Sequence, residues 1–240
     1  MTNVNNILAD TSNRQYPLPE KKWKYFQEWH DTLFFHWKVA PDLLHDYIPE
    51  DLELDVLDDY AWVSLVAFEV RNMRLRNLPP FPYVSHFHEI NIRTYVVKDG
   101  IPGIYLFSIE TDKFIEVLLT NLFIGLPYRK TKIKRTENQL LSGNDFLTNQ
   151  VDISFDYKTA SEIKKTETDF WLTERHSLYE KNKRKTYRFD IHHKKWELKK
   201  LDASISSIKY NAGKFNLNIN PDSIQYSEKI DVVLWGKEIV

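Results

Sequence analysis

The sequence predicts a mainly β fold with a few helices, and three observations indicate it. Aromatic residues are abundant, with 7 Trp, 13 Tyr and 14 Phe among 240 residues, and such rings pack well on the pleated surface of a sheet. Short apolar runs alternate with charged turns along most of the chain. Glycine occurs only 6 times, which argues against a fold built on a glycine-rich phosphate loop.

The composition excludes several classes of protein. Apolar residues make up 42% of the chain, enough for a sizeable core, and the net charge is −1. That charge provides no global field for nucleic acid or an anionic membrane, so we expect neither partner. Cysteine is absent, which excludes disulfides and thiolate metal ligands and agrees with a cytoplasmic location. No apolar signal segment and no run of 18 apolar residues occurs.

The chain is expected to form a single domain over residues 23–240. Residues 1–22 are expected to be a flexible N-terminal arm, because Pro17 and Pro19 discourage regular structure there. Charge rises after residue 129, but strand-like runs continue and no linker composition separates two halves.

The first half of the chain contains the clearest strand patterns. Residues 30–37 are apolar on both faces, which predicts a strand buried on both sides. Pro41 is placed to open a short helix that ends before Pro49. Turn-forming pairs at Asp58-Asp59 and Asp99-Gly100 predict hairpins. The other strands expected here span residues 52–56, 60–71, 86–97 and 104–110.

One amphipathic segment predicts a helix at residues 113–124. Its apolar residues include Ile115, Leu118 and Leu122 at helical spacing. The remaining positions are also largely apolar, so we expect this helix to be buried. Gly125 suits its C-terminal cap. Strands are then expected at residues 151–157, 170–173, 186–192, 196–201, 224–226 and 232–235.

The strand at residues 86–97 carries the most chemical information. Because side chains alternate between the two faces of a strand, one face combines polar groups with aromatic rings: Phe87, Glu89, Asn91, Arg93 and Tyr95. A few polar groups among apolar ones are typical of a ligand cavity. The alternative is a solvent-exposed sheet face with a Glu89–Arg93 ion pair of little energetic value.

His86 and His88 offer an alternative metal site, because both imidazoles lie on the other face of this strand. Glu89 points away from them, so a third ligand would have to come from elsewhere, such as His36 or His193. The simpler interpretation is two histidines at a strand end, and we predict no metal and no cofactor.

A basic run at residues 128–135 contains five cations. It predicts either an edge strand on which lysines prevent strand pairing with other molecules or, alternatively, a phosphate-contacting edge. No Walker loop, HExxH motif or GxGxxG motif occurs in the chain.

Several motifs together resemble the YqjF-like family of uncharacterised proteins, over most of residues 28–200. They are FHW (35–37), AWVSLVAFEVRNMR (61–74), HEINIRTYV (88–96), PGIYLFSIE (102–110) and WLTERHSLY (171–179). The resemblance implies the fold of acetoacetate decarboxylase: a conical, partly open antiparallel β-barrel with a cavity and a buried helix. It also implies that Glu89 matches a carboxylate of the decarboxylase cavity.

The same resemblance argues against Schiff-base chemistry. The decarboxylase helix is followed by Gly, an aromatic residue, Pro and two lysines, and the first lysine forms the imine. In this chain residues 125–130 read GLPYRK, so Tyr128 and Arg129 occupy the two lysine positions. A tyrosine cannot form an imine.

We therefore predict a small-molecule-binding barrel or an enzyme of unknown reaction, acting on a small carboxylate or carbonyl metabolite. Arg93 would bind the carboxylate, and Glu89 would act as a general acid or base. The residues expected to contribute further ligand contacts are Asn91, Tyr95, Tyr128, His36 and His193. The alternative is a non-catalytic ligand sensor or interaction module. A homo-oligomer is possible, because barrels of this type often self-associate.

Overall fold

The computed structural model describes most of the chain. The described residues are 4–80, 85–113, 126, 128–144, 150–212, 215–217 and 220–240. The helix expected at residues 113–124 lies outside this part of the chain, apart from its first residue.

The described strands form one sheet of 15 strands, with few helices, so the prediction of a mainly β fold is confirmed. In chain order the strands are β1 (Tyr25–Val39), β2 (Glu53–Leu54), β3 (Ala61–Leu75), β4 (Phe87–Lys98), β5 (Ile101–Thr111), β6 (Tyr128–Lys130), β7 (Lys132–Arg135), β8 (Gln139–Gly143), β9 (Gln150–Glu162), β10 (Ser177–Asn182), β11 (Lys185–His193), β12 (Lys199–Ala212), β13 (Phe215–Leu217), β14 (Ser223–Leu234) and β15 (Glu238–Ile239). The α-helices are α1 (Val4–Ala9) and α3 (Glu167–Thr173), and short 3-10 turns span Pro41–Leu43 and His45–Tyr47.

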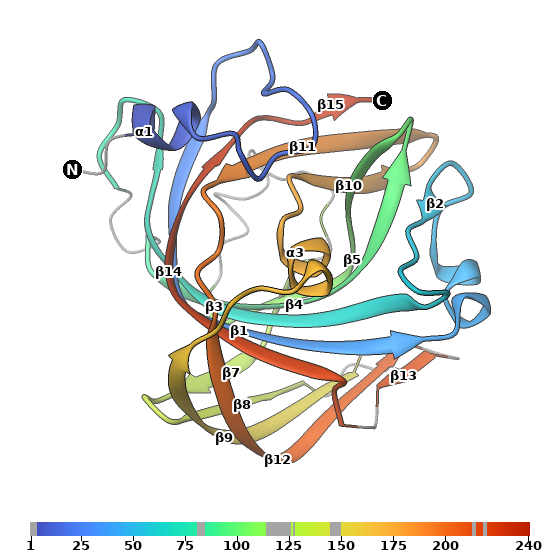
Figure 1. The fold of residues 1–240 in the computed structure, drawn as a ribbon, viewed down its shortest axis with the longest axis vertical. Coiled ribbons are helices and arrows are strands. Elements are labelled where there is room, and N and C mark those ends of the chain that lie inside the picture. The colour runs from blue at the N-terminus through green and yellow to red at the C-terminus, as the bar shows by residue number, and fades with distance from the viewer. Residues whose placement is uncertain are drawn as a thin grey trace.

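Part of the sheet closes on itself. Strands β11, β10, β5, β4, β3, β1 and β14 pair in that order, and β14 pairs again with β11, which makes a closed ring (Figure 1). Within this ring only β5 and β10 run parallel. A Cβ atom at Gly103 would come within 2.6 Å of the Tyr179 ring, so glycine permits the close approach of β5 and β10 that completes the ring.

The hairpin predicted at Asp99-Gly100 joins β4 and β5. The turn predicted at Asp58-Asp59 is present, but the hairpin predicted there is not, because β2 pairs with β4 and only an isolated bridge links Leu57 and Tyr60. Asp58 and Asp59 have φ values of 53° and 65°, and Asp99 and Gly100 have 51° and 75°. Two successive left-handed residues are the requirement of a type I′ hairpin, and Asp and Gly tolerate that conformation better than most residues.

A second layer of strands, β12, β9, β8 and β7, continues from β14 and covers the outer face of β1, β3 and β4. The outer face of the ring packs against this layer through Phe35, Leu65 and Ile92, which meet Ile153 and Phe155. The inner face of the same strands forms a separate core inside the ring. Strand β1 is therefore buried on both faces, as its sequence predicted.

Helix α3 replaces the strand that was expected at residues 170–173, and that prediction was wrong. Thr166 and Asp169 form a capping box, in which the Thr166 hydroxyl accepts from the Asp169 amide at 3.1 Å and Asp169 accepts from the Thr166 amide at 2.8 Å. This pair satisfies the first amides of a helix. The helix lies against the inner face of the ring, where Tyr95 Oη donates to the Leu172 carbonyl at 3.0 Å (Figure 1).

The N-terminal segment, which was expected to be a flexible arm, packs on the ring over part of its length. Ile7 of α1 is buried beside Phe26 and Val233. Arg14 donates to Asp190 at 2.7 Å. These contacts supply partners for the few apolar and cationic side chains of the segment.

The basic run at residues 128–135 divides into two short strands. Strand β6 pairs with β5, while β7 lies at one end of the strand order, as expected for an edge strand. Among the described residues, no helix has the length and apolarity needed to span a membrane.

Candidate functional site

The polar face of β4 lines the inside of the ring. Glu89, Asn91 and Arg93 stand opposite Phe68, Val66 and Ser64 of β3. Phe68 and Val66 belong to the interior core, as do Phe87 and Tyr95 of β4 itself. The predicted set therefore shares one face, and that face is the inner one.

Glu89 is a carboxylic acid in an interior position. Asn91 Nδ2 donates to its Oε1 at 3.3 Å, and Tyr128 Oη donates to its Oε2 at 3.4 Å. Burial raises the pKa of Glu89 to about 7, and the two hydrogen bonds only partly oppose that rise. This residue can therefore hold or release a proton near neutral pH, as a general acid or base requires.

Tyr128 reaches Glu89 from β6, which runs beside β5. Burial and the neighbouring Glu89 raise the pKa of Tyr128 well above its usual value, so the phenol stays protonated and remains a hydrogen-bond donor. The predicted contacts of Asn91 and Tyr128 are thus directed to the same carboxyl group.

Arg93 is a buried cation with no counter-ion among the residues that the structure describes. Arg93 is 8% exposed. Its guanidinium forms no hydrogen bond or ion pair with any residue that the structure describes. Its Cζ lies 6.0 Å from the centre of the Tyr95 ring. Because an unpaired buried charge is costly, this guanidinium is available to bind an anion.

A second guanidinium, which sequence reasoning missed, also lies close to the Tyr95 ring. Arg175 is 6% exposed, and its Cζ lies 5.0 Å from the Tyr95 ring and 4.1 Å from the Trp171 ring. Its Nη1 pairs with Asp55 at 2.5 Å, but its buried Nη2 has no partner within the described part of the chain. Asp55 therefore pairs with Arg175 but not with Arg93.

His36 and Tyr95 are bound into a hydrogen-bond network. His36 is fully buried, not at a cavity rim. Its Nδ1 is 2.6 Å from Ser64 Oγ, which in turn is 2.6 Å from Tyr95 Oη. Burial and the charge of Arg93 lower the pKa of His36 to about 3. A neutral imidazole at this position adds no second cation beside Arg93, and the network fixes the position of the Tyr95 ring, whose centre lies 6.0 Å from Arg93 Cζ and 5.0 Å from Arg175 Cζ.

The remaining histidines of the sequence analysis lie apart from this wall. His193, at the end of β11, is buried and belongs to a different cluster with Glu174 and His176. His86 is exposed, and its Nδ1 lies 2.9 Å from Ser85 Oγ. His88 points to the outer side of the ring. Among the described residues, the group close enough to share a metal ion does not include His86 or His88.

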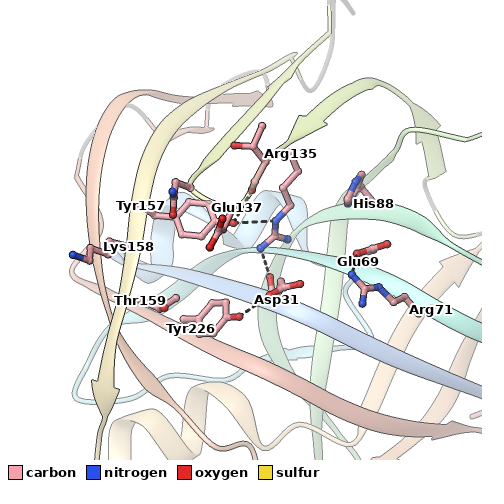
Figure 2. Close-up of a pocket in the computed structure, with 12 residues that line it drawn as sticks. Asp31, Glu69, Arg71, His88, Arg135, Glu137, Tyr157, Lys158, Thr159 and Tyr226 are labelled. Carbon is pink, nitrogen blue, oxygen red and sulfur yellow. Dashed lines mark hydrogen bonds and ion pairs between the residues drawn. The ribbon is translucent and has the colours of Figure 1, made fainter.

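A hollow of about 860 Å³ lies on the outer side of β4 between the ring and the second layer. Figure 2 shows Asp31, Glu69, Arg71, His88 and Arg135 around it. Arg71 pairs with Glu69 at 2.5 Å and Tyr226 donates to Asp31 at 2.6 Å. Arg135 donates to the Tyr157 hydroxyl at 3.2 Å, and its buried Nη1 has no partner among the described residues. Arg93 forms no hydrogen bond or ion pair with any described residue and shares its strand face with Glu89 and Asn91, so the interior wall is our candidate for an anion site.

The raised pKa of Glu89 has a consequence for stability. Between the unfolded pKa of about 4.3 and the folded value of about 7, the folded state binds more protons than the unfolded state. Stability contributed by this group is therefore lost as the pH rises through that window. We expect Glu89→Gln to raise the free energy of unfolding by roughly 2–3 kcal/mol near pH 8 and to change it little near pH 5.

Urea unfolding at the two pH values measures this effect, and Glu69→Gln is a matched control. Hydrogen bonding to Arg71 holds the pKa of Glu69 below its usual value despite burial. Glu69→Gln should therefore lower stability at the higher pH. Equal effects of the two substitutions at the higher pH would contradict the assignment of Glu89 as a destabilised carboxylate.

Comparison with known proteins finds a family and a sequence relative that match most of the chain. Residues 26–231 match the DUF2071 family, described as an uncharacterized conserved protein. The chain is 36% identical over 227 residues to the uncharacterized protein YqjF of Bacillus subtilis (strain 168), covering 91% of this chain and 93% of that protein.

Solved structures of acetoacetate decarboxylase-like proteins share the fold at low sequence identity. An acetoacetate decarboxylase-like enzyme from Sphingomonas wittichii RW1 has a TM-score of 0.59 at 10% identity, over 95% of this chain and 97% of that one. The enduracididine biosynthesis enzyme MppR has a TM-score of 0.59 at 11% identity, over 95% and 90%. Acetoacetate decarboxylase from Legionella pneumophila has a TM-score of 0.58 at 13% identity, over 95% and 94%. The expected acetoacetate decarboxylase-like fold is thereby confirmed.

Proposed function

Because this chain belongs to the DUF2071 family of uncharacterized conserved proteins, we propose its function from the interior of the ring: the ring binds a small metabolite that carries a carboxylate or a carbonyl group. The observation that supports the proposal is the buried Arg93 guanidinium, which has no counter-ion among the described residues. A ligand carboxylate would supply the missing charge and accept paired N–H bonds.

Arg175 strengthens the anion site in this proposal. Its Nη2 is a free donor within the described part of the chain, and the rings of Tyr95 and Trp171 flank it. Aromatic walls and two guanidinium groups favour a flat anionic group over a bulky or neutral one.

Glu89 would supply the acid or base chemistry. It lies four residues from Arg93 along β4, which corresponds to roughly 13 Å between their Cα atoms. A ligand that touches both side chains must therefore extend along the strand between the anion site and the carboxyl group. Glu89 in its protonated form would donate to a carbonyl oxygen of such a ligand, with Asn91 and Tyr128 holding the carboxyl group in place.

The solved relatives agree with this ligand class. Structures of MppR include a complex with pyruvate, and other similar structures are an acetoacetate decarboxylase and an acetoacetate decarboxylase-like enzyme. The sequence resemblance puts Tyr128 where the decarboxylases carry their imine-forming lysine. We therefore propose acid–base chemistry without a Schiff base if the protein is an enzyme.

Binding is the direct test of the anion site. Titration calorimetry with pyruvate and acetoacetate should show binding, whereas acetone, which lacks the carboxylate, should bind far more weakly. Arg93→Gln should weaken binding of the carboxylates by about tenfold or more. This variant should still fold, because it removes an unpaired buried charge.

Arg71→Gln is the matched control, since Arg71 lies on the outer side of the ring and already pairs with Glu69. It should leave affinity unchanged. If a broad screen of small carboxylates finds none that binds, or if Arg71→Gln and Arg93→Gln weaken binding equally, the site is wrongly assigned.

The alternative function is a ligand sensor or interaction module without catalysis, favoured by the tyrosine at the position of the lysine. Turnover distinguishes the two functions. An enzyme should consume a bound β-keto acid and lose this activity in Glu89→Gln, whereas a sensor should bind the ligand unchanged. A cytoplasmic location and a homo-oligomer remain proposals that fractionation and sedimentation can test.

A further inference from the structure

A buried cluster of acid and imidazole groups lies away from the proposed ligand site. Glu174 directly follows helix α3, His176 precedes β10, and His193 ends β11. One donor atom from each residue lies within 4.8 Å of the others, and all three residues are at most 2% exposed. Segments far apart in the sequence thus bring two imidazoles and a carboxylate together.

The hydrogen bonds of the two imidazoles fix where their lone pairs lie. His176 Nε2 is 3.3 Å from the Asn13 carbonyl, and His193 Nδ1 is 2.7 Å from the Lys194 carbonyl. A carbonyl oxygen can only accept, so each of these ring nitrogens carries the proton. The other nitrogen of each ring therefore keeps a free lone pair. In His193 the protonated Nδ1 is also the nitrogen that lies 3.9 Å from Glu174 Oε2, so a metal would bind Nε2 or displace the proton from Nδ1. A backbone carbonyl that orients a histidine in this way is typical of metal-binding imidazoles.

No donor in the described part of the chain reaches the free lone pair of His176. Its Nδ1 is buried and has no hydrogen-bond partner among the described residues. A neutral imidazole with one unprotonated nitrogen is the form that binds metal.

The carboxylate of Glu174 is held from several sides. Lys165 Nζ and the Trp196 amide donate to its Oε1, the latter at 3.1 Å. Asn13 Nδ2 donates to its Oε2 at 2.6 Å, and Asn13 Oδ1 is buried without a partner among the described residues. A half turn of this amide would present a further oxygen to the same centre.

We propose that Glu174, His176 and His193 form a binding site for a divalent transition metal, with Zn²⁺ as the best fit. Two imidazole nitrogens and one carboxylate oxygen are a ligand set that zinc accepts, and Asn13 or water would complete a tetrahedron. Zinc requires ligand distances near 2.0–2.2 Å, so the three donor atoms would draw together on binding. The metal would join α3 and the β10–β11 pair to the N-terminal segment through Asn13.

The test uses full-length protein purified without a polyhistidine tag. After treatment with a chelator and dialysis, Zn²⁺ is titrated in competition with a chromophoric chelator, and bound metal is measured by mass spectrometry. We expect about one Zn²⁺ per chain. Because His176→Gln removes one of only three protein ligands, we expect it to weaken zinc binding by about 10- to 100-fold or more.

His192→Gln provides a matched control. His192 is also buried, its Nε2 lies 2.9 Å from the Ile7 carbonyl, and its ring lies 5.6 Å from that of His176, yet it is not part of the group of three. Its substitution should leave zinc affinity unchanged. If His192→Gln and His176→Gln weaken binding equally, these three ligands are wrongly chosen.

Co²⁺ provides a measurement that needs no variant. Bound at a site with two imidazoles and a carboxylate, it should give the visible absorption of tetrahedral cobalt, and Zn²⁺ should displace it. Failure of the folded native protein to bind either Zn²⁺ or Co²⁺ would overturn the proposal, whatever the variants do. Neither measurement depends on the ligand proposed for Arg93.

Discussion

Asp190→Asn is expected to lower the free energy of unfolding by about 3–5 kcal/mol. Asp190 is 2% exposed, its Oδ1 pairs with Arg14 at 2.7 Å, and its Oδ2 pairs with Arg188 at 3.1 Å. The Arg14 side chain is fully buried, and burial lowers its pKa. Removing the carboxylate charge would leave this guanidinium without compensation, which costs far more than the loss of an ordinary hydrogen bond.

Glu238 is a more exposed carboxylate that also pairs with Arg188, and it provides the control. Glu238 lies 2.6 Å from Lys21 and 3.7 Å from Arg188, and both cations are at least partly exposed. Glu238→Gln should therefore change stability by less than about 1 kcal/mol. Chemical denaturation of both variants at neutral pH measures the difference. A loss of similar size in both would mean that burial of the Arg14–Asp190 pair contributes nothing.

This pair also shows why the N-terminal segment could not be read from local sequence. Pro17 and Pro19 correctly exclude a helix or strand around them, and the segment has few apolar residues. Its attachment depends on Arg14 meeting Asp190, which is 176 residues away. No local pattern reports such a contact, because an arginine in a polar segment looks the same whether it is solvated or buried.

The polar face of β4 was predictable for the opposite reason. Alternation along a strand is a local property, and it assigned Glu89, Asn91 and Arg93 to one face before any partner strand was known. Flanking Phe87 and Tyr95 indicated that this face is enclosed. The sequence could not reveal that Glu89 and Arg93 do not pair, or that Arg175 and Asp55, 120 residues apart, complete the surroundings of Arg93.

The sequence contains a local signal for the start of helix α3, but neighbouring residues favoured a strand. Thr166 followed three residues later by Asp169 is a capping pattern, but the aromatic residues Phe170 and Trp171 favoured a strand. The correct interpretation changes the site, because the helix brings Trp171 to 4.7 Å from the Tyr95 ring and leads directly into Glu174 and Arg175. An unnoticed helix start therefore concealed both the second guanidinium and the proposed metal ligand.

Phe35→Ala is expected to destabilise the protein by about 3–5 kcal/mol. Phe35 is fully buried between the ring and the second layer. Its ring centre lies 4.7 Å from that of Phe155 on β9, so truncation removes apolar contact on both sides and leaves a cavity that rigid strands cannot close. Leu43→Ala is the control, because Leu43 is 58% exposed and its loss should cost no more than about 0.5 kcal/mol.

The same variant tests whether residues 23–240 act as one cooperative domain. The two layers share β1, β3 and β4, whose opposite faces form the two cores, so disruption on one face should be felt on the other. Native-state hydrogen exchange on Phe35→Ala should then show the most protected amides of β4 and β9 losing protection by the same free energy. Loss confined to β9, with β4 still protected as in the native protein, would mean that the second layer unfolds independently of the ring and that the chain contains two units.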